Sequence, residues 1–139
     1  MTGRVELFLH PDLQELRRMD DAVEQLAAEQ DWSAKLSFQV KLILEELVIN
    51  VMNYGFPEGM DRHDIEVRLD STPERLVIEI VDQGQPFDPF TEAPTEDVTS
   101  ALEDRAIGGL GVHLVQTLVD EATYTRDGNY NRARLIKRR

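Results

Sequence analysis

Glu46 and Asn50 form a polar pair whose spacing could support chemistry. They are four residues apart in a stretch with apolar residues at three- and four-residue spacing, and no Gly or Pro occurs before Gly55. Both side chains therefore project from one face of the predicted helix. An Asn within a helix lowers helix propensity, but its amide oxygen is a ligand that Mg²⁺ accepts together with phosphates and water.

Glu46 lies one turn before Asn50 on the predicted helix. From there a carboxylate could orient or deprotonate a hydroxyl that attacks a γ-phosphate. The alternative interpretation is a polar pair on a solvated helix edge.

The second segment, Asp82-Gln-Gly84-Gln-Pro-Phe87, follows a strand pattern over residues 75–81. At the strand end the Asp82 carboxylate could accept a hydrogen bond from the exocyclic amine of adenine, whereas guanine presents an acceptor there. Gly84 permits close approach of backbone to the base, and Phe87 supplies an apolar wall. An ordinary Asp-x-Gly turn is the alternative.

The third segment, Gly108-Gly-Leu-Gly111, opens a helix whose apolar face begins at Val112. Glycines directly before a helix let backbone N–H groups converge on an anion, and the helix N-terminus adds a partial positive charge. The segment has neither the Gly-Lys-Ser/Thr of a P-loop nor the third glycine of a dinucleotide fingerprint. A flexible hinge is the alternative. In this order, the three segments predict one ATP site.

Composition restricts the class of protein. The chain has 139 residues with 41% hydrophobic content, enough for one domain with its own core, and it lacks the Cys that disulfides or thiolate metal sites require. The net charge of -12 argues against direct nucleic-acid binding and favours a protein partner or a Mg²⁺-neutralised ligand. No run resembles a signal peptide or a membrane span, so we expect a cytoplasmic protein that does not enter the membrane.

Charge is distributed unevenly along the chain. From Asp82 to Asp104 there are seven acids and no Lys or Arg. Prolines interrupt this stretch and periodicity is weak, which predicts a mobile loop. Because a long loop in a compact domain is usually functional, we expect a lid over about residues 85–107 that orders over bound nucleotide. A solvated insertion is the alternative.

The remaining patterns indicate the architecture. Alternation predicts strands at 4–9, 64–69, 75–81, 122–126 and 133–137, and helical spacing predicts helices at 11–29, around 36–51 and after Gly111. The last four strands form two hairpins. Helices and strands are thus segregated rather than alternating in βαβ repeats. We predict a single domain over 1–139 with an α+β fold, a two-layer α/β sandwich with helices on one face of a mixed, mostly antiparallel sheet.

Together the three segments resemble the N, G1 and G2 boxes of the ATP-binding superfamily that includes gyrase, histidine kinases and the MutL mismatch-repair proteins. From Val5 to Lys137 the chain more closely resembles the stand-alone bacterial anti-sigma factor serine/threonine kinases of the RsbW and SpoIIAB type. The stretches that carry this resemblance are Asn50-Val-Met-Asn-Tyr-Gly55 and Gly109-Leu-Gly-Val-His-Leu-Val-Gln-Thr-Leu-Val-Asp120. It implies the histidine-kinase-like ATP-binding fold.

The resemblance also implies residue roles. Glu46 would be the catalytic base, Asn50 the Mg²⁺ ligand and Asp82 the adenine reader, with Gly109 and Gly111 at the phosphates. The nucleotide site that it implies comprises Asn50, Asn53, Asp82, Gly84, Phe87, Arg105, Gly108, Gly109, Leu110, Gly111 and Val112. Three positions depart from the family pattern and could alter nucleotide affinity: Tyr54, where many members carry His, and Gln83 and Gln85.

The resemblance implies that the protein is an anti-sigma regulatory factor. It would bind ATP with Mg²⁺, phosphorylate Ser or Thr of a STAS-type anti-sigma factor antagonist and sequester a sigma factor, and a homodimer is possible. One alternative is a nucleotide-gated protein-binding module without phosphoryl transfer. A detached histidine-kinase catalytic domain is disfavoured because no His-bearing dimerisation helix occurs. Transfer to a partner's Ser or Thr separates these hypotheses.

Overall fold

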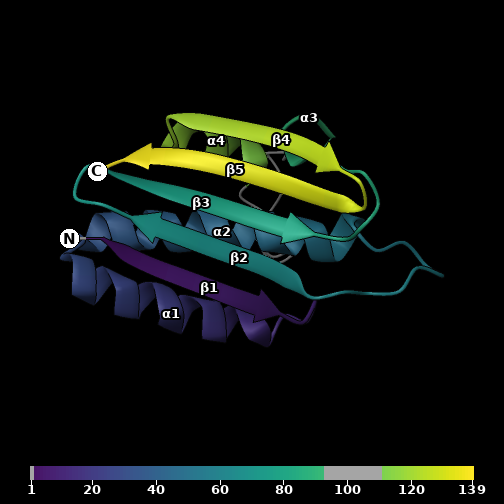
Figure 1. Ribbon diagram of the computed structural model, residues 1–139, viewed down its shortest axis with the longest axis horizontal. Coiled ribbons are helices and arrows are strands. Elements are labelled where there is room, and N and C mark those ends of the chain that lie inside the picture. The colour runs from purple at the N-terminus through teal and green to yellow at the C-terminus, as the bar shows by residue number, and fades with distance from the viewer. Residues whose placement is uncertain (1, 93–110) are drawn as a thin grey trace, which may run out of the picture.

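The structure is a computed structural model that describes residues 2–92 and 111–139. Helices lie on one side of a sheet (Figure 1). In chain order the elements are β1 (Gly3–Leu9), α1 (Glu15–Gln30), α2 (Ala34–Tyr54), β2 (Ile65–Ser71), β3 (Arg75–Asp82), α3 (Pro89–Glu92), α4 (Val112–Leu118), β4 (Glu121–Asp127) and β5 (Tyr130–Arg138).

The strands form one five-stranded sheet in the order β1-β2-β3-β5-β4. Each of these pairings is antiparallel, so the sheet of the described residues contains none of the parallel pairing that a mixed sheet would have. The two predicted hairpins, β2–β3 and β4–β5, are confirmed. The β3–β5 pairing joins the hairpins and places Asp82 directly opposite Asn131.

The helix α2 forms where its apolar periodicity predicted it. Ser33 caps its N-terminus, because the Ser33 hydroxyl accepts a hydrogen bond from the Leu36 N–H at 3.1 Å. The helix ends at Tyr54, and the Gly55 N–H closes the last turn on the Val51 carbonyl at 2.8 Å. This uninterrupted helix carries the polar residues of its last two turns to one end of the sheet.

The helix α1 begins later than predicted. We expected it to start at Pro11, but it starts at Glu15. Asp12 provides a physical reason, since its carboxylate accepts from the Gln14 N–H at 2.9 Å and its carbonyl accepts from the Glu15 N–H at 2.9 Å. Such local side-chain bonding favours a turn over helix.

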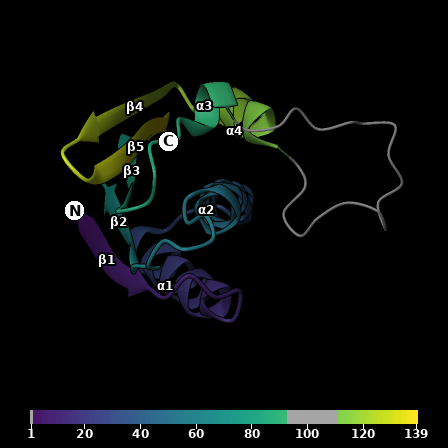
Figure 2. The same cartoon turned by 90° about the vertical axis from the view of Figure 1, so that its right-hand side faces the viewer.

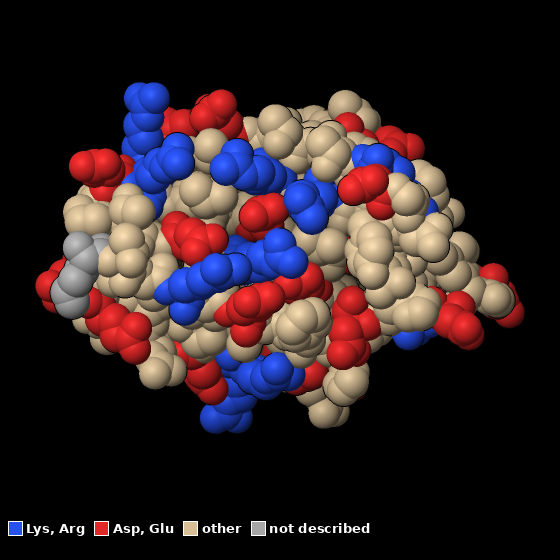
Figure 3. Space-filling model, viewed as in Figure 1, with Lys and Arg blue, Asp and Glu red and all other residues tan. Residues whose placement is uncertain are grey.

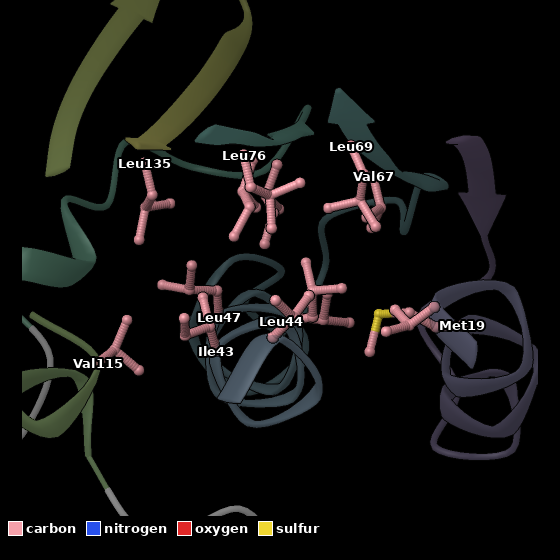
Figure 4. Close-up of a cluster of buried hydrophobic side chains, with 14 of the residues drawn as sticks. Met19, Ile43, Leu44, Leu47, Val67, Leu69, Leu76, Val115 and Leu135 are labelled. Atoms are coloured by element: carbon pink, nitrogen blue, oxygen red, sulfur yellow. The ribbon is translucent and has the colours of Figure 1, made fainter. Parts of the chain in front are cut away.

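The core lies between the helices and one face of the sheet (Figure 2). β2 shows the expected alternation, with each residue in turn buried and half-buried along its length. Side chains from α1, α2, α4 and the strands meet in this core (Figure 4). The labelled members include Met19, Ile43, Leu44, Leu47, Val67, Leu69, Leu76, Val115 and Leu135. The two-layer α+β prediction is confirmed.

The opposite face of the sheet is charged, with acidic and basic side chains interleaved across it (Figure 3). Arg68 lies 2.6 Å from Glu66, and Arg132 lies 3.6 Å from Glu79. Ion pairs of this kind contribute little each, but they cover a sheet face that no described helix packs against. No helix among the described residues is long and apolar enough to span a membrane.

Candidate active site

A hollow lies at the end of the sheet where α2 ends, between the last turns of α2 and the strands β3, β4 and β5. Most of its wall is apolar. A few polar side chains are set into that wall, the usual composition of a small-molecule site. Its lining residues are Leu47, Asn50, Val51, Gly55, Ile80, Asp82, Phe87, Pro89, Tyr124, Asn131 and Ala133.

Asn50 lines this hollow from α2, and its orientation is fixed by its own helix. The side-chain nitrogen donates to the Glu46 carbonyl at 2.7 Å. The amide oxygen, Oδ1, accepts no hydrogen bond from any described residue. Asn50 therefore keeps an acceptor for a ligand, as its predicted role requires.

Glu46 lies one turn earlier on α2 and is buried, with 4% of its surface exposed. It is not among the residues that line the hollow, although Leu47 and Asn50 on either side of it are. The two residues of the predicted pair therefore differ in their access to the hollow. Asn50 faces the hollow, and Glu46 lies beside it within the protein.

Asp82 lines the hollow from the end of β3, and one of its oxygens is held by two donors. Oδ1 accepts from the Gly84 N–H at 2.8 Å and from the Asn131 side-chain nitrogen at 2.9 Å. The other oxygen, Oδ2, accepts from no described residue. The carboxylate is therefore oriented by one oxygen and keeps the second as an acceptor.

Burial raises the pKa of Asp82 above its usual range. Hydrogen bonds from Asn131 and Gly84, and the positive charge of Arg126, act in the opposite direction. These three groups stabilise the ionised carboxylate that burial disfavours.

Asn131, Tyr124 and Arg126 were not singled out from the sequence. Asn131 also donates to the Gln85 carbonyl at 2.8 Å, and its own oxygen accepts from the Tyr124 hydroxyl. Arg126 donates to the Gly84 carbonyl at 2.7 Å. The β4–β5 hairpin thus braces the turn after Asp82. One signal was present in the sequence, because Asn131 occupies the inward phase of a strand continued by Ala133 and Leu135.

Gly84 is required by the protein's own packing. A Cβ at this position would lie 2.5 Å from the Gly55 carbonyl oxygen and 2.9 Å from Asp82 Oδ1. The next residue continues this contact, since the Gln85 N–H donates to the Gly55 carbonyl at 2.8 Å. The close approach that we predicted for a base is thus made in the structure by the C-terminus of α2.

Phe87 forms part of the apolar wall, as predicted. Its ring stacks on Tyr54, with centroids 5.3 Å apart and an interplanar angle of 22°. Tyr54, where many members of the resembled family carry His, therefore supports the wall of the hollow. Gln85 adds a hydrogen bond from its side-chain nitrogen to the Tyr54 carbonyl at 2.7 Å.

The third predicted segment is described only at its end. Gly111 precedes α4 with φ 84°, a left-handed conformation that glycine adopts without strain. Val112 is 1% exposed and packs in the core, so its side chain serves packing. Arg105, Gly108, Gly109 and Leu110 lie outside the described residues, as do residues 93–107 of the predicted lid. Asn53 is exposed on α2 and does not line the hollow.

The donor set fits Mg²⁺ only as a partly protein-bound ion. The described residues contain no group of three or more His, Asp or Glu placed to hold a metal by themselves. The side-chain oxygen of Asn50 accepts from none of the residues that the structure describes, so it can act as one ligand. One protein oxygen with phosphates and water is the set that Mg²⁺ uses in nucleotide sites.

These features are those of a histidine-kinase-like ATPase fold. Its hollow is mostly apolar, with a few polar side chains in the wall. Residues 9–137 match the family described as the histidine kinase-like ATPase domain, and the chain belongs to this family. Membership implies an ATP-binding protein, and it confirms the resemblance inferred from the three segments.

The chain is similar to named members of the family. It is 28% identical over 109 residues to the serine/threonine-protein kinase BtrW of Bordetella bronchiseptica, covering 78% of this chain and 75% of that protein. It is 29% identical over 91 residues to the serine-protein kinase RsbW of Bacillus licheniformis, covering 59% of this chain and 53% of that protein. For RsbW of Listeria monocytogenes the identity is 27% over 120 residues, covering 84% and 74%.

One solved structure supports the fold. It contains the RsbU and RsbW domains of Rv1364c from Mycobacterium tuberculosis, and it matches with a TM-score of 0.62 at 15% identity over 98% of this chain. The match covers 32% of that chain, so this protein corresponds to about a third of it.

Proposed function

We propose that this protein is an ATP-dependent protein serine/threonine kinase of the anti-sigma type. It transfers the γ-phosphoryl group of Mg-ATP to a Ser or Thr of a STAS-type anti-sigma factor antagonist, and it sequesters a sigma factor. One observation carries the proposal: Asn50 Oδ1 and Asp82 Oδ2, to which no described residue donates, both belong to the lining of a mostly apolar hollow in a chain of this family. The names of the relatives support the kinase assignment.

Asp82 has the properties of an adenine reader. Its Oδ1 is occupied by two protein donors, which leaves Oδ2 to accept from the exocyclic amine of the base. The stacked Phe87 and Tyr54 rings, with Ile80 and Ala133, supply apolar surface for the ring system. Guanine would present a carbonyl oxygen to the same carboxylate and would be repelled.

Asn50 is the residue that would hold Mg²⁺, through its side-chain oxygen. A bound ion would neutralise negative charge that develops on the phosphate groups. The hydrogen bond from Asn50 to the Glu46 carbonyl prevents the amide from turning its nitrogen toward the ion. Gly111, at the N-terminus of α4, belongs to the phosphate end of the site in this proposal.

Glu46 is the proposed general base for the hydroxyl of the substrate. A buried carboxylate beside the metal ligand is placed to accept the proton from that hydroxyl as the bond to phosphorus forms. Because Glu46 does not line the hollow itself, substrate must reach it from the side of α2 next to Asn50.

The partner assignment rests on the relatives. Kinases named BtrW and RsbW are similar to this chain over 78% and 59% of its length. The net charge of -12 suits a protein partner better than nucleic acid. An antagonist and a sigma factor would compete for this one regulator. The regulator itself could form a homodimer. Because a kinase of this type would meet its ATP and its sigma factor in the cytoplasm, we propose that the protein acts there.

The decisive experiment is phosphoryl transfer in a defined mixture. The full chain is incubated with γ-labelled ATP, Mg²⁺ and purified STAS-type antagonists encoded near it, and the labelled residue is mapped by mass spectrometry. Label on one Ser or Thr of an antagonist is the expected result. Nucleotide binding without any labelled partner would favour the nucleotide-gated binding module instead.

A further inference from the structure

Asp20 of α1 and Glu45 of α2 meet between the two helices, away from the hollow. The Asp20 side chain lies within hydrogen-bonding reach of the Glu45 side chain, although both are carboxyl groups. Asp20 Oδ1 is fully buried, and with both groups ionised no described residue donates a hydrogen bond to it. Two carboxylates offer only acceptors, so a hydrogen bond between them requires a proton on one of the pair.

The position of the pair makes ionisation of both groups costly. Met19 and Leu44, the residues immediately before Asp20 and Glu45, have no exposed surface and lie in the core between the helices and the sheet (Figure 4). α1 and α2 pack side by side on the same face of the sheet (Figure 2). Both side chains are half-buried, so two negative charges at the edge of such a core would repel each other with less screening than in free solvent.

The charged groups around Glu45 strengthen this effect. Among the described residues they are Asp20 and Glu24 on α1, and Lys41 and Glu46 on α2. Lys41 forms an ion pair with Glu24, so the one cation of the group is already engaged. Burial first, then the contact with Asp20 and the charge of Glu46, together raise the pKa of Glu45 to about 7, and the charge of Lys41 opposes this rise.

We propose that Asp20 and Glu45 share one proton in mildly acidic solution, and that loss of this proton as the solution becomes mildly alkaline loosens the contact between α1 and α2. The pair is a pH-sensitive latch between two helices. The latch requires neither bound nucleotide nor phosphoryl transfer. Its functional interest is that α2 also carries Asn50, so the latch holds the helix on which the hollow is built.

The sign of the pH effect follows from the raised pKa of Glu45. Between the ordinary value of 4.5 and about 7 the folded chain binds more protons at this site than the unfolded chain does. The free energy of unfolding therefore falls as pH rises through this window and stays lower above it. Glu45→Gln resembles the protonated form and cannot lose a proton, so this variant should lack the fall.

A carboxyl ¹³C titration of the full chain tests the shared proton directly. The Glu45 side-chain carbon should titrate with a midpoint about pH 7, the value to which its pKa is raised. In Asp20→Asn the amide can donate to the Glu45 carboxylate, so the midpoint should fall toward the ordinary range. A wild-type midpoint already in the ordinary range for Glu would overturn the proposal. This part of the experiment uses only the wild-type chain, so it does not depend on the folding of a variant.

Thermal unfolding at pH 5.5 and pH 8 tests the latch. Glu45→Gln should raise Tm by several degrees at pH 8 and change it little at pH 5.5. Adding Asp20→Asn to Glu45→Gln should produce no further gain at pH 8, because both substitutions remove the same repulsion. Glu24→Gln is the matched control, since it breaks the Lys41 ion pair on the same interface and should shift Tm equally at both pH values. Equal shifts for Glu45→Gln at the two pH values would overturn the latch.

Discussion

Asn131 on β5 lies directly opposite Asp82 on β3, and its side-chain nitrogen donates to Asp82 Oδ1 at 2.9 Å. Asn131 also donates to the Gln85 carbonyl and accepts from the Tyr124 hydroxyl, so its amide is satisfied on both sides. The residue that orients the proposed adenine reader therefore lies 49 positions away in the sequence. Strand pairing therefore acts together with the local hydrogen bond from the Gly84 N–H to set the direction of the Asp82 carboxylate.

Asn131→Ala should weaken both the fold and nucleotide binding. The substitution removes a donor from a buried carboxylate, which typically costs about 1–3 kcal/mol in the free energy of unfolding. The pKa of Asp82, already raised by burial, should rise further because the Asn131 hydrogen bond opposes that rise. Denaturant unfolding and ATP titration measure the two effects. Asn129→Ala, in the exposed turn of the same hairpin, should change neither; equal effects of the two variants would remove the special role of Asn131.

Gly84→Ala should destabilise the chain, because its Cβ would lie 2.5 Å from the Gly55 carbonyl oxygen. Relieving this clash must move the turn or the end of α2, at a cost of about 1–3 kcal/mol. Gly59→Ala provides a comparison. It meets no atom within 4 Å but has φ 88°, so it reports backbone strain alone. Chemical denaturation of both variants should show the larger loss for Gly84→Ala, and the reverse order would mean that the loop near Gly84 shifts freely.

Much of this fold could be predicted from periodicity. The apolar spacing of α2 and the alternation of the strands locate these elements, because helix and strand bury one face with different periods. The start of α1 could not be predicted in this way. There the side chain of Asp12 bonds the backbone locally and delays the helix to Glu15.

The candidate site could be predicted in part. Asn50, Asp82 and Phe87 line the hollow as expected, because each follows from a local pattern. Asn131 and Tyr124 could not be found with the same certainty, since their role depends on the pairing of β3 with β5 and of β5 with β4. Contacts across strands far apart in sequence are fixed by register, which only the assembled sheet defines.

Asp82→Asn should lower ATP affinity while keeping the fold. The Asn oxygen can still accept from the Gly84 N–H and the Asn131 amide, but the group at the Oδ2 position becomes a donor and cannot accept from the adenine amine. Losing a hydrogen bond to a charged acceptor corresponds to about a 10- to 100-fold weaker affinity. Isothermal titration with ATP and with GTP measures it. Equal affinities of the wild type for the two nucleotides would refute the assignment of Asp82.

Asn50→Ala should mainly reduce the Mg²⁺ dependence of nucleotide binding. The change removes the side-chain oxygen that faces the hollow and also the hydrogen bond to the Glu46 carbonyl, which α2 can lose because that carbonyl lies within a long helix. ATP affinity measured with and without excess chelator separates the metal effect from the rest. The exposed Asn53 on the same helix gives the matched control, Asn53→Ala. If the wild type and Asn50→Ala respond identically to Mg²⁺, Asn50 has only a structural role.

Glu46→Gln should abolish most phosphoryl transfer while leaving ATP binding nearly intact. The substitution keeps the shape of the side chain and removes its ability to take a proton, and a positioned general base typically contributes ~10²–10⁴-fold to rate. Single-turnover transfer to the antagonist and ATP titration give the two readouts.

Glu45→Gln, one residue earlier and turned toward α1, is the register control. It is best compared at pH 6, where Glu45 is already protonated because its pKa is raised to about 7, so the replacement should matter little there. If Glu45→Gln loses transfer and Glu46→Gln retains it, the general base is Glu45 and not Glu46. Transfer retained in both would show that neither carboxylate is the base, and a wild type that phosphorylates no partner would leave nucleotide-gated binding as the better account.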